Sequence, residues 1–167
     1  MGKFRVLVTG FEPFGGHTTN ISSLLAEQCV GLQHLAHPWN DSQIEVEFTF
    51  DILSVDQAGS VKTAQRINEG ESWDAILHLG LCEQCSLPRI ERRAQDVVRM
   101  RIPDNAGRQI TDEVLTGDGH RGSWIDPSIW PEDALPLPFE ISTDAGTYLC
   151  NETYYRTLEA LISSPHK

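Results

Sequence analysis

The chain has 167 residues, with 24 acidic and 13 basic side chains and a formal net charge of −11 at pH 7. This length suits one domain with a sizeable core, whereas the acidic balance argues against nucleic acid or an anionic membrane as a partner. No apolar run approaches the length that crosses a membrane. We therefore expect a single domain over residues 1–167, whose first apolar run, residues 4–8, is a strand and not a leader.

The cysteines are few for a chain of this length: Cys29, Cys82, Cys85 and Cys150. So few cysteines predict a reducing compartment, and we expect a cytoplasmic location. Cys82 and Cys85 have the spacing of half a zinc site or of a redox pair. Because no second CxxC or HxxxH partner occurs, we expect no metal and no other cofactor.

The first predicted strand leads into a loop, residues 9–20, that contains three glycines and a proline. Both phosphate-binding glycine motifs are absent, and the loop has no lysine or arginine. Phe11 and Phe14 flank its Glu-Pro corner. Two interpretations stay open: these rings line an apolar pocket, or they fill the core.

Strand and helix patterns then alternate. A helix capped by Asn20 or Ser22 is expected to present Leu24, Leu25, Cys29 and Leu32 on one face. Residues 44–50 alternate as a half-buried strand near a sheet edge, residues 55–68 have a helical pattern that Gly70 ends, and residues 73–80 are a second buried strand. This order predicts an α/β domain with a mostly parallel sheet, whose ligands bind at the carboxyl ends of the strands.

The next part of the chain is less regular. Residues 89–102 are expected to form a twisted hairpin, followed by a turn over residues 102–107. Residues 116–122 and 127–138 form a long irregular region. Irregular regions of this length in a compact domain usually serve function or oligomer formation.

Cys150 follows a short apolar run at Phe139 and Ile141 that is expected to end a strand. Residues 142–144 are all helix-capping types, and a helical pattern follows them, so Cys150 is expected near the first turns of a helix. Free N–H groups and the helix dipole there favour a thiolate over a thiol. The alternative is a small cysteine packed under a helix.

Glu91 is a candidate for the group that orients the base of a cysteine nucleophile, because it lies among arginines in a half-apolar stretch. The alternative is a surface carboxylate paired with a neighbouring arginine.

Four segments, in order along nearly the whole chain, resemble the motifs of pyroglutamyl peptidase I: residues 8–16 with Asn20, Gly80 followed by residues 91–94, residues 101–107, and residues 142–151. The resemblance implies a three-layer α/β/α sandwich with a mostly parallel, partly mixed sheet. It also implies a cysteine peptidase that removes N-terminal pyroglutamate from peptides. Cys150 matches the nucleophile and Glu91 the acid of a Cys-His-Glu triad. Phe11, Phe14 and Ile102 match the lining of the pyrrolidone pocket, and Arg101 matches an arginine of the oxyanion region.

The chain also departs from this family. Two cysteines and a glutamate occupy the loop after Gly80, where family members usually have small residues, and this difference bears on specificity. Family members continue past the cysteine helix into a strand that carries the catalytic histidine, whereas this chain ends at Lys167 with His166 beside it. Two alternatives follow: a truncated chain, or a divergent member that has lost the triad.

Three functions are therefore compared. The first is hydrolysis of peptides with N-terminal pyroglutamate. Because family members often form oligomers, the resemblance also suggests a homo-oligomer. The second is a catalytically impaired member that binds pyroglutamyl groups without hydrolysis. The third is a thiol-redox or metal protein built on Cys82 and Cys85, for which a disulfide between them or bound metal would be evidence.

Overall fold

The computed structural model describes residues 3–37, 39–40, 42–130 and 137–164. The first half of the chain forms β1 (Phe4–Phe11), α1 (Ile21–Gln28), β2 (Gly31–Ala36), β3 (Gln43–Leu53), α2 (Gln57–Asn68) and β4 (Ala75–His78). The second half forms β5 (Arg89–Glu91), β6 (Arg93–Ala94), β7 (Arg121–Gly122), the 3-10 turn η1 (Pro127–Ile129), β8 (Glu140–Ser142) and α3 (Leu149–Ser163).

The main sheet has four strands in the order β2-β3-β1-β4. β1 is parallel to both β3 and β4, while β2 is antiparallel to β3, so the predicted mostly parallel, partly mixed sheet is confirmed. The alternation in β3 suggested a strand near the sheet edge, but β3 lies inside the sheet, between β2 and β1. β2 was not predicted: Leu32 belongs to this strand and not to the preceding helix, because Gly31, at a φ of 85°, turns the chain after α1.

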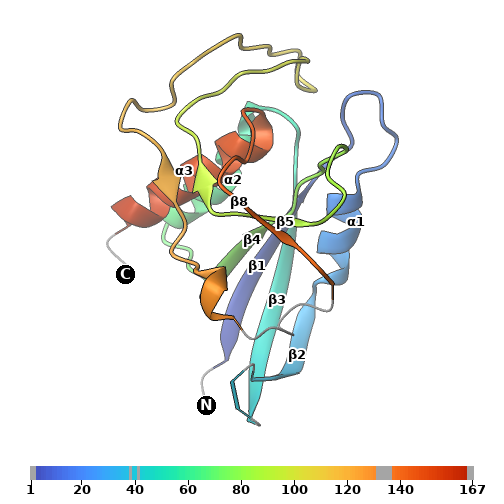
Figure 1. The fold of residues 1–167 in the computed structure, drawn as a ribbon, viewed down its shortest axis with the longest axis vertical. Coiled ribbons are helices and arrows are strands. Elements are labelled where there is room, and N and C mark those ends of the chain that lie inside the picture. Colours follow the sequence, from blue (N-terminus) through green and yellow to red (C-terminus); the bar gives the residue numbers. More distant parts are fainter. Residues whose placement is uncertain (1–2, 38, 41, 131–136, 165–167) are drawn as a thin grey trace.

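Helices cover both faces of this sheet, which gives three layers (Figure 1). On one face, Gly10 of β1 touches α1 so closely that a β-carbon there would clash with the carbonyl of Ser22. On the other face, the side chain of Thr9 meets His78 of β4, which in turn meets Thr157 of α3. α2 packs beside α3 on this second face through Ala64, Ile67 and Ala160.

The close approach at Gly10 determines which side of α1 is buried. The helix buries its small residues Ser22 and Ala26, while Leu24 and Leu25 remain 45% and 46% exposed. The predicted apolar face of this helix is therefore wrong, because only small side chains fit against the glycine. β4 differs in a similar way: Leu77 is 50% exposed, since β4 has only one neighbour in the four-stranded sheet.

The helix ends follow local capping rules in α2 but not in α3. Asp56 caps α2 by accepting a hydrogen bond of 2.8 Å from the Gly59 N–H, and Gly70 ends the helix as predicted. α3 begins only at Leu149, after Tyr148, which makes no side-chain capping bond. The predicted capping residues 142–144 lie further upstream, where Asp144 closes a turn by accepting from the Gly146 N–H.

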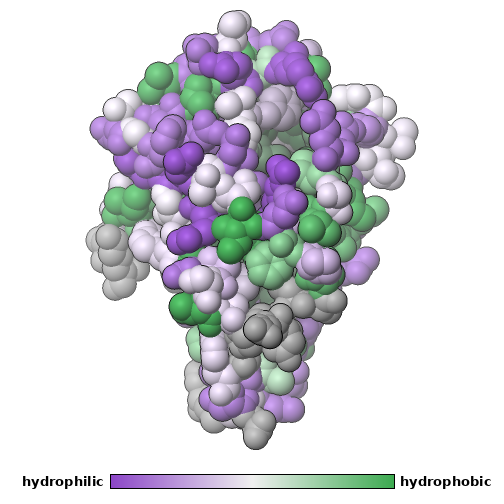
Figure 2. Space-filling view, viewed as in Figure 1, coloured by the Kyte–Doolittle hydropathy of each residue, from purple (hydrophilic) through white to green (hydrophobic). Residues whose placement is uncertain are grey.

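Residues 89–102 do not form a hairpin with themselves. β5 pairs in parallel with β8, β6 pairs antiparallel with β7, and Val98 bridges to Glu113. The loops that connect these short strands lie above the sheet in Figure 1, and Figure 2 shows mostly hydrophilic residues over that part of the surface. Part of the predicted irregular region, residues 131–136, lies outside the described residues. Within the described ranges, no helix has the length and apolar character to cross a membrane.

Candidate active site

Cys150 is the second residue of α3, which confirms its predicted place near the first turn of a helix. Its thiol faces Gly80, two residues after the end of β4. A β-carbon at Gly80 would lie 3.1 Å from the sulfur, so the backbone approaches the thiol as closely as a glycine allows. This contact joins the end of a parallel strand to the start of a helix, where α/β proteins commonly bind ligands.

The protonation state of Cys150 differs from the expectation. Burial raises the pKa of its thiol to about 11, and the hydrogen bond from its own backbone N–H lowers that pKa by a smaller amount. Desolvation of the charged form therefore outweighs the helix terminus. At neutral pH the sulfur is a thiol, so a base must remove its proton before it can act as a nucleophile.

An apolar wall stands beside Cys150. The ring of Phe14 packs on the ring of Tyr148 with centroids 5.8 Å apart. The Cδ1 atom of Ile102 lies 3.3 Å from where a β-carbon of Gly15 would be, so the 101–107 turn meets the glycine loop here. The Tyr148 hydroxyl donates a 3.2 Å hydrogen bond to the carbonyl of Pro103 and ties this turn to α3.

Phe11 and Phe14 occupy different depths. Phe11 is 3% exposed and belongs to the buried cluster that also contains Leu53, Val98 and Leu149. Phe14, Tyr148 and Cys150 are partly buried and pack against that cluster. Tyr148 was missed by sequence analysis as part of this wall, although it lies two residues before Cys150 in the segment of residues 142–151.

Glu91 ends β5, and its Oε2 atom is buried without a hydrogen-bond partner. The three neighbouring arginines are used elsewhere: Arg89 pairs with Glu140, Arg92 lies 3.9 Å from Asp126, and Arg93 donates to the carbonyl of Thr143. The alternative of a surface carboxylate paired with a neighbouring arginine therefore does not describe Glu91. A buried carboxylate oxygen without a partner is rare in folded proteins and calls for an explanation.

The described histidines all have partners other than Cys150. His17 pairs with Glu83, His34 with Glu45, His37 accepts from the Trp39 N–H, and His120 accepts from the Asp96 N–H. His78 lies between Thr9 and Thr157, and burial lowers its pKa to about 4. His166 lies outside the described residues. Within the described ranges, therefore, no histidine hydrogen-bonds the Cys150 thiol.

Arg101, predicted for the oxyanion region, has an exposed side chain, and its carbonyl accepts a hydrogen bond of 3.2 Å from Gln109. The turn that carries it is anchored by buried charges that sequence analysis missed. Arg108 donates to Asp104 at 3.0 Å and to Glu152 of α3 at 2.8 Å, and Arg156 also donates to Glu152. The spacing of Glu152 and Arg156 on one helix was the available signal.

Cys82 and Cys85 form a disulfide. A thiol pair of this kind was one of the two interpretations of the CxxC spacing, and in the disulfide state neither sulfur is a thiolate ligand for a metal. The described part of the chain contains no group of three or more histidine, cysteine, aspartate or glutamate side chains placed to hold a metal ion.

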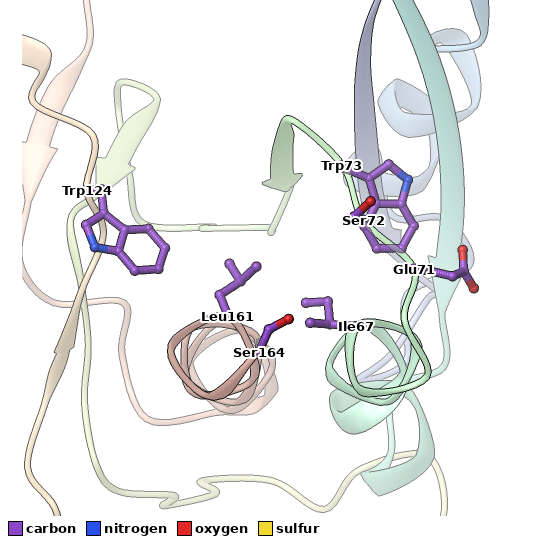
Figure 3. Close-up of a pocket in the computed structure, with 7 residues that line it drawn as sticks. All are labelled: Ile67, Glu71, Ser72, Trp73, Trp124, Leu161 and Ser164. Carbon is purple, nitrogen blue, oxygen red and sulfur yellow. The ribbon is translucent and has the colours of Figure 1, made fainter. Parts of the chain in front are cut away.

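A separate cavity of about 320 Å³ lies away from Cys150, between the ends of α2 and α3. Figure 3 shows Trp73 and Trp124 on opposite sides of it, with Ile67 of α2, Leu161 of α3 and Ser164, directly after α3, between them. None of the predicted site residues lines this cavity.

The fold and the site together define a class: an α/β/α protein with a cysteine at the amino end of a helix, next to the carboxyl ends of parallel strands. The sequence model of the family described as "Pyroglutamyl peptidase" matches residues 4–166. The chain belongs to this family of cysteine-type peptidases, which confirms the resemblance of the motifs.

Named relatives agree with this assignment. A pyrrolidone-carboxylate peptidase of Clavibacter michiganensis subsp. michiganensis is 31% identical over 166 residues, which cover 96% of this chain and 73% of that protein. The one from Pyrococcus furiosus is 31% identical over 158 residues, covering 92% and 72%. The solved structure of pyrrolidone carboxyl peptidase from Thermococcus litoralis has a TM-score of 0.75 at 27% identity, covering 96% of this chain and 71% of that one.

Proposed function

We propose that this protein removes N-terminal pyroglutamate from peptides, with Cys150 as its nucleophile. Membership of the pyroglutamyl peptidase family supports the reaction. The observation that carries the assignment to Cys150 is its geometry: the sulfur lies at the amino end of α3, faces Gly80, and stands next to the wall of Phe14 and Tyr148.

In the proposed reaction, the Cys150 sulfur attacks the carbonyl carbon that joins pyroglutamate to the next residue. The carbon–nitrogen bond of the tetrahedral intermediate then breaks, and the peptide leaves with a proton on its new amino group. Water hydrolyses the thioester, which releases pyroglutamate and restores the thiol. Backbone N–H groups at the start of α3, assisted by Arg101, stabilise the oxyanion.

A base is required because the pKa of the Cys150 thiol is raised to about 11. We assign the base role to a histidine that Glu91 orients. The buried Oε2 atom of Glu91, which has no partner among the described residues, is the acceptor that an imidazole N–H would need. His166 is the candidate after Cys150 in the chain, and it lies outside the described residues.

The proposed substrate group is a small neutral lactam with little charge to bind. Phe14 and Ile102, with Phe11 buried in the adjoining cluster, would offer an apolar surface that suits such a ring, and a few polar contacts would fix its orientation. An ordinary peptide would bring a charged amino group to the same surface. Rejection follows because an uncompensated buried charge costs several kcal/mol, on the order of a thousand-fold in affinity.

One pair of observations favours a second function, the binding of pyroglutamyl groups without hydrolysis. The Cys150 thiol is protonated at neutral pH, and within the described ranges no histidine hydrogen-bonds it. In a protein without a base for Cys150, the apolar wall would still bind the lactam ring, but the peptide bond would not be hydrolysed.

Release of a fluorophore from an L-pyroglutamyl amide by the 167-residue chain tests the proposal. We expect turnover that Cys150→Ser abolishes and that Cys29→Ser leaves unchanged, because Cys29 lies at the far end of α1. Turnover that survives in Cys150→Ser would refute the assignment. Saturable binding of pyroglutamate by calorimetry, with no turnover in any variant, would establish the second function.

A further inference from the structure

The loop after Gly80 contains a pair of cysteines that the backbone holds close together. The Cys85 N–H donates a 3.3 Å hydrogen bond to the Cys82 carbonyl, so residues 82–85 form a tight turn. This turn brings the two α-carbons to 5.4 Å, a separation that suits a disulfide. A backbone hydrogen bond also holds the turn, so its shape does not depend on the disulfide alone, which would allow the two sulfurs to be oxidised again after reduction.

The pair is open to small thiols. Cys82 is exposed and Cys85 is half-buried, and the disulfide closes a ring of only four residues. Exposed disulfides are the ones that undergo thiol exchange, whereas structural disulfides are usually protected. Cys150 differs in its surroundings, because Gly80 lies against its sulfur.

The ring is connected to the candidate active site at two points. Glu83, inside the ring, contacts the Nε2 atom of His17 at 2.7 Å, and the His17 ring meets the edge of Phe14 with centroids 6.3 Å apart. On the other side, Gly80 lies two residues before Cys82 and approaches the Cys150 sulfur closely. A change in the ring therefore reaches both the apolar wall and the nucleophile.

We propose that Cys82 and Cys85 form a reversible thiol–disulfide exchange site for low-molecular-weight disulfides of the glutathione class, and that its oxidation state controls access to Cys150. The consequence for catalysis rests on the proposed peptidase function. The exchange itself and the access to Cys150 do not depend on it.

The chemistry balances with oxidised glutathione as oxidant. The Cys82 thiolate attacks one sulfur of glutathione disulfide, forming a mixed disulfide and releasing one glutathione thiolate. The Cys85 thiolate then attacks the Cys82 sulfur, closes the ring and releases the second glutathione. Two electrons pass from the protein thiols to the glutathione disulfide, and excess reduced glutathione reverses both steps.

The oxidised ring holds Glu83 at His17, and Gly80 lies against the Cys150 sulfur. Reduction leaves the turn with one backbone hydrogen bond and removes the covalent closure that orients Glu83. In the proposal, the segment from Gly80 to Cys85 then moves away from the Cys150 sulfur more often, so that reagents and substrates reach the sulfur faster.

The test equilibrates the full chain in glutathione buffers from fully reduced to fully oxidised, removes the glutathione, and adds N-ethylmaleimide. Mass spectrometry of peptides reports the state of Cys82 and Cys85 and the alkylation rate of Cys150, with Cys29 as internal standard. We expect Cys150 to react at least three-fold faster in the reduced protein. In Cys82→Ser/Cys85→Ser that difference should vanish, and in Glu83→Gln the disulfide should form but protect Cys150 less.

Two results would overturn the proposal: cysteines that stay reduced in every glutathione buffer, or a disulfide that forms without changing the alkylation rate of Cys150. The single variant Cys82→Ser, with circular dichroism to confirm its fold, repeats the test if the double variant does not fold. Because alkylation needs no turnover, failure of the exchange site is distinguished from failure of the peptidase proposal.

Discussion

Two segments adjoin neighbours of Cys150, and they are held by different kinds of interaction. The 101–108 turn contacts Tyr148 and Glu152, and the 81–87 loop directly follows Gly80. The turn at residues 101–108 is anchored by buried charges: the side chains of Asp104 and Glu152 are 0% and 1% exposed, and Arg108 bridges them. The loop at residues 81–87 is held by a disulfide and by the contact of His17 with Glu83, whose side chains are 46% and 59% exposed.

This difference indicates which of the two segments can change its conformation or sequence at a small cost in stability. A buried ion pair that loses one partner leaves an uncompensated charge, whereas an exposed pair is screened by water and contributes little. By its sequence, the segment of residues 101–107 resembles the motif of the family, and the loop after Gly80 is the predicted departure from it. We infer that the first segment fixes the site and that the second adapts or regulates it.

The largest effect on stability is expected when the buried charges that anchor the 101–108 turn are disrupted. Glu152→Ala leaves Arg108 and Arg156 without their shared carboxylate, and we expect a loss of about 3 kcal/mol in the free energy of unfolding. Urea unfolding followed by circular dichroism measures it. Glu159→Ala is the matched control on the same helix, because the Glu159 side chain is 32% exposed whereas that of Glu152 is 1% exposed, and Arg121 keeps its second partner, Asp118. Equal losses in the two variants would contradict the comparison.

A second effect concerns His78, which supports the strand that leads into the 81–87 loop. Burial lowers its pKa from 6.5 to about 4, so the folded state favours the neutral ring. Its contribution to stability is present above pH 6.5 and is lost as the pH falls through 4, by about 3 kcal/mol in total.

Unfolding measured between pH 7 and pH 4 in wild type and His78→Gln tests this effect. The variant should lose part of the acid dependence, since glutamine does not titrate in this range. His34→Gln is the control, because the His34 side chain is 58% exposed. An unchanged pH profile in His78→Gln would show that other groups cause the acid sensitivity.

The smallest effect on stability is expected when the exposed contact between Glu83 and His17 is removed. Glu83→Ala removes the partner of His17, and we expect the free energy of unfolding to fall by about 1 kcal/mol or less. Urea unfolding with the disulfide intact measures it. A loss as large as that of Glu152→Ala would mean that the 81–87 loop is as strongly anchored as the 101–108 turn.

Much of the fold could be predicted from local signals. The alternation in β3, the Gly70 end of α2 and the place of Cys150 in α3 all depend on residues that are close in sequence. Capping, periodicity and glycine geometry act over a few residues, so a single sequence contains them. The predictions were wrong where a segment far along the chain decides which side chains are buried, as at the exposed strand β4 and at Leu24 and Leu25 of α1.

The sequence alone determined the family, the presence of β1, α1, β3, α2 and β4, and the identity of the candidate nucleophile, because these follow from residue types and spacing. Only the tertiary structure decided that Cys150 is a protonated thiol under Gly80 and that the Oε2 atom of Glu91 is buried without a partner. It also decided that buried ion pairs join the 101–108 turn to α3. Burial, desolvation and charge pairing depend on which distant segments meet, and no local pattern specifies that.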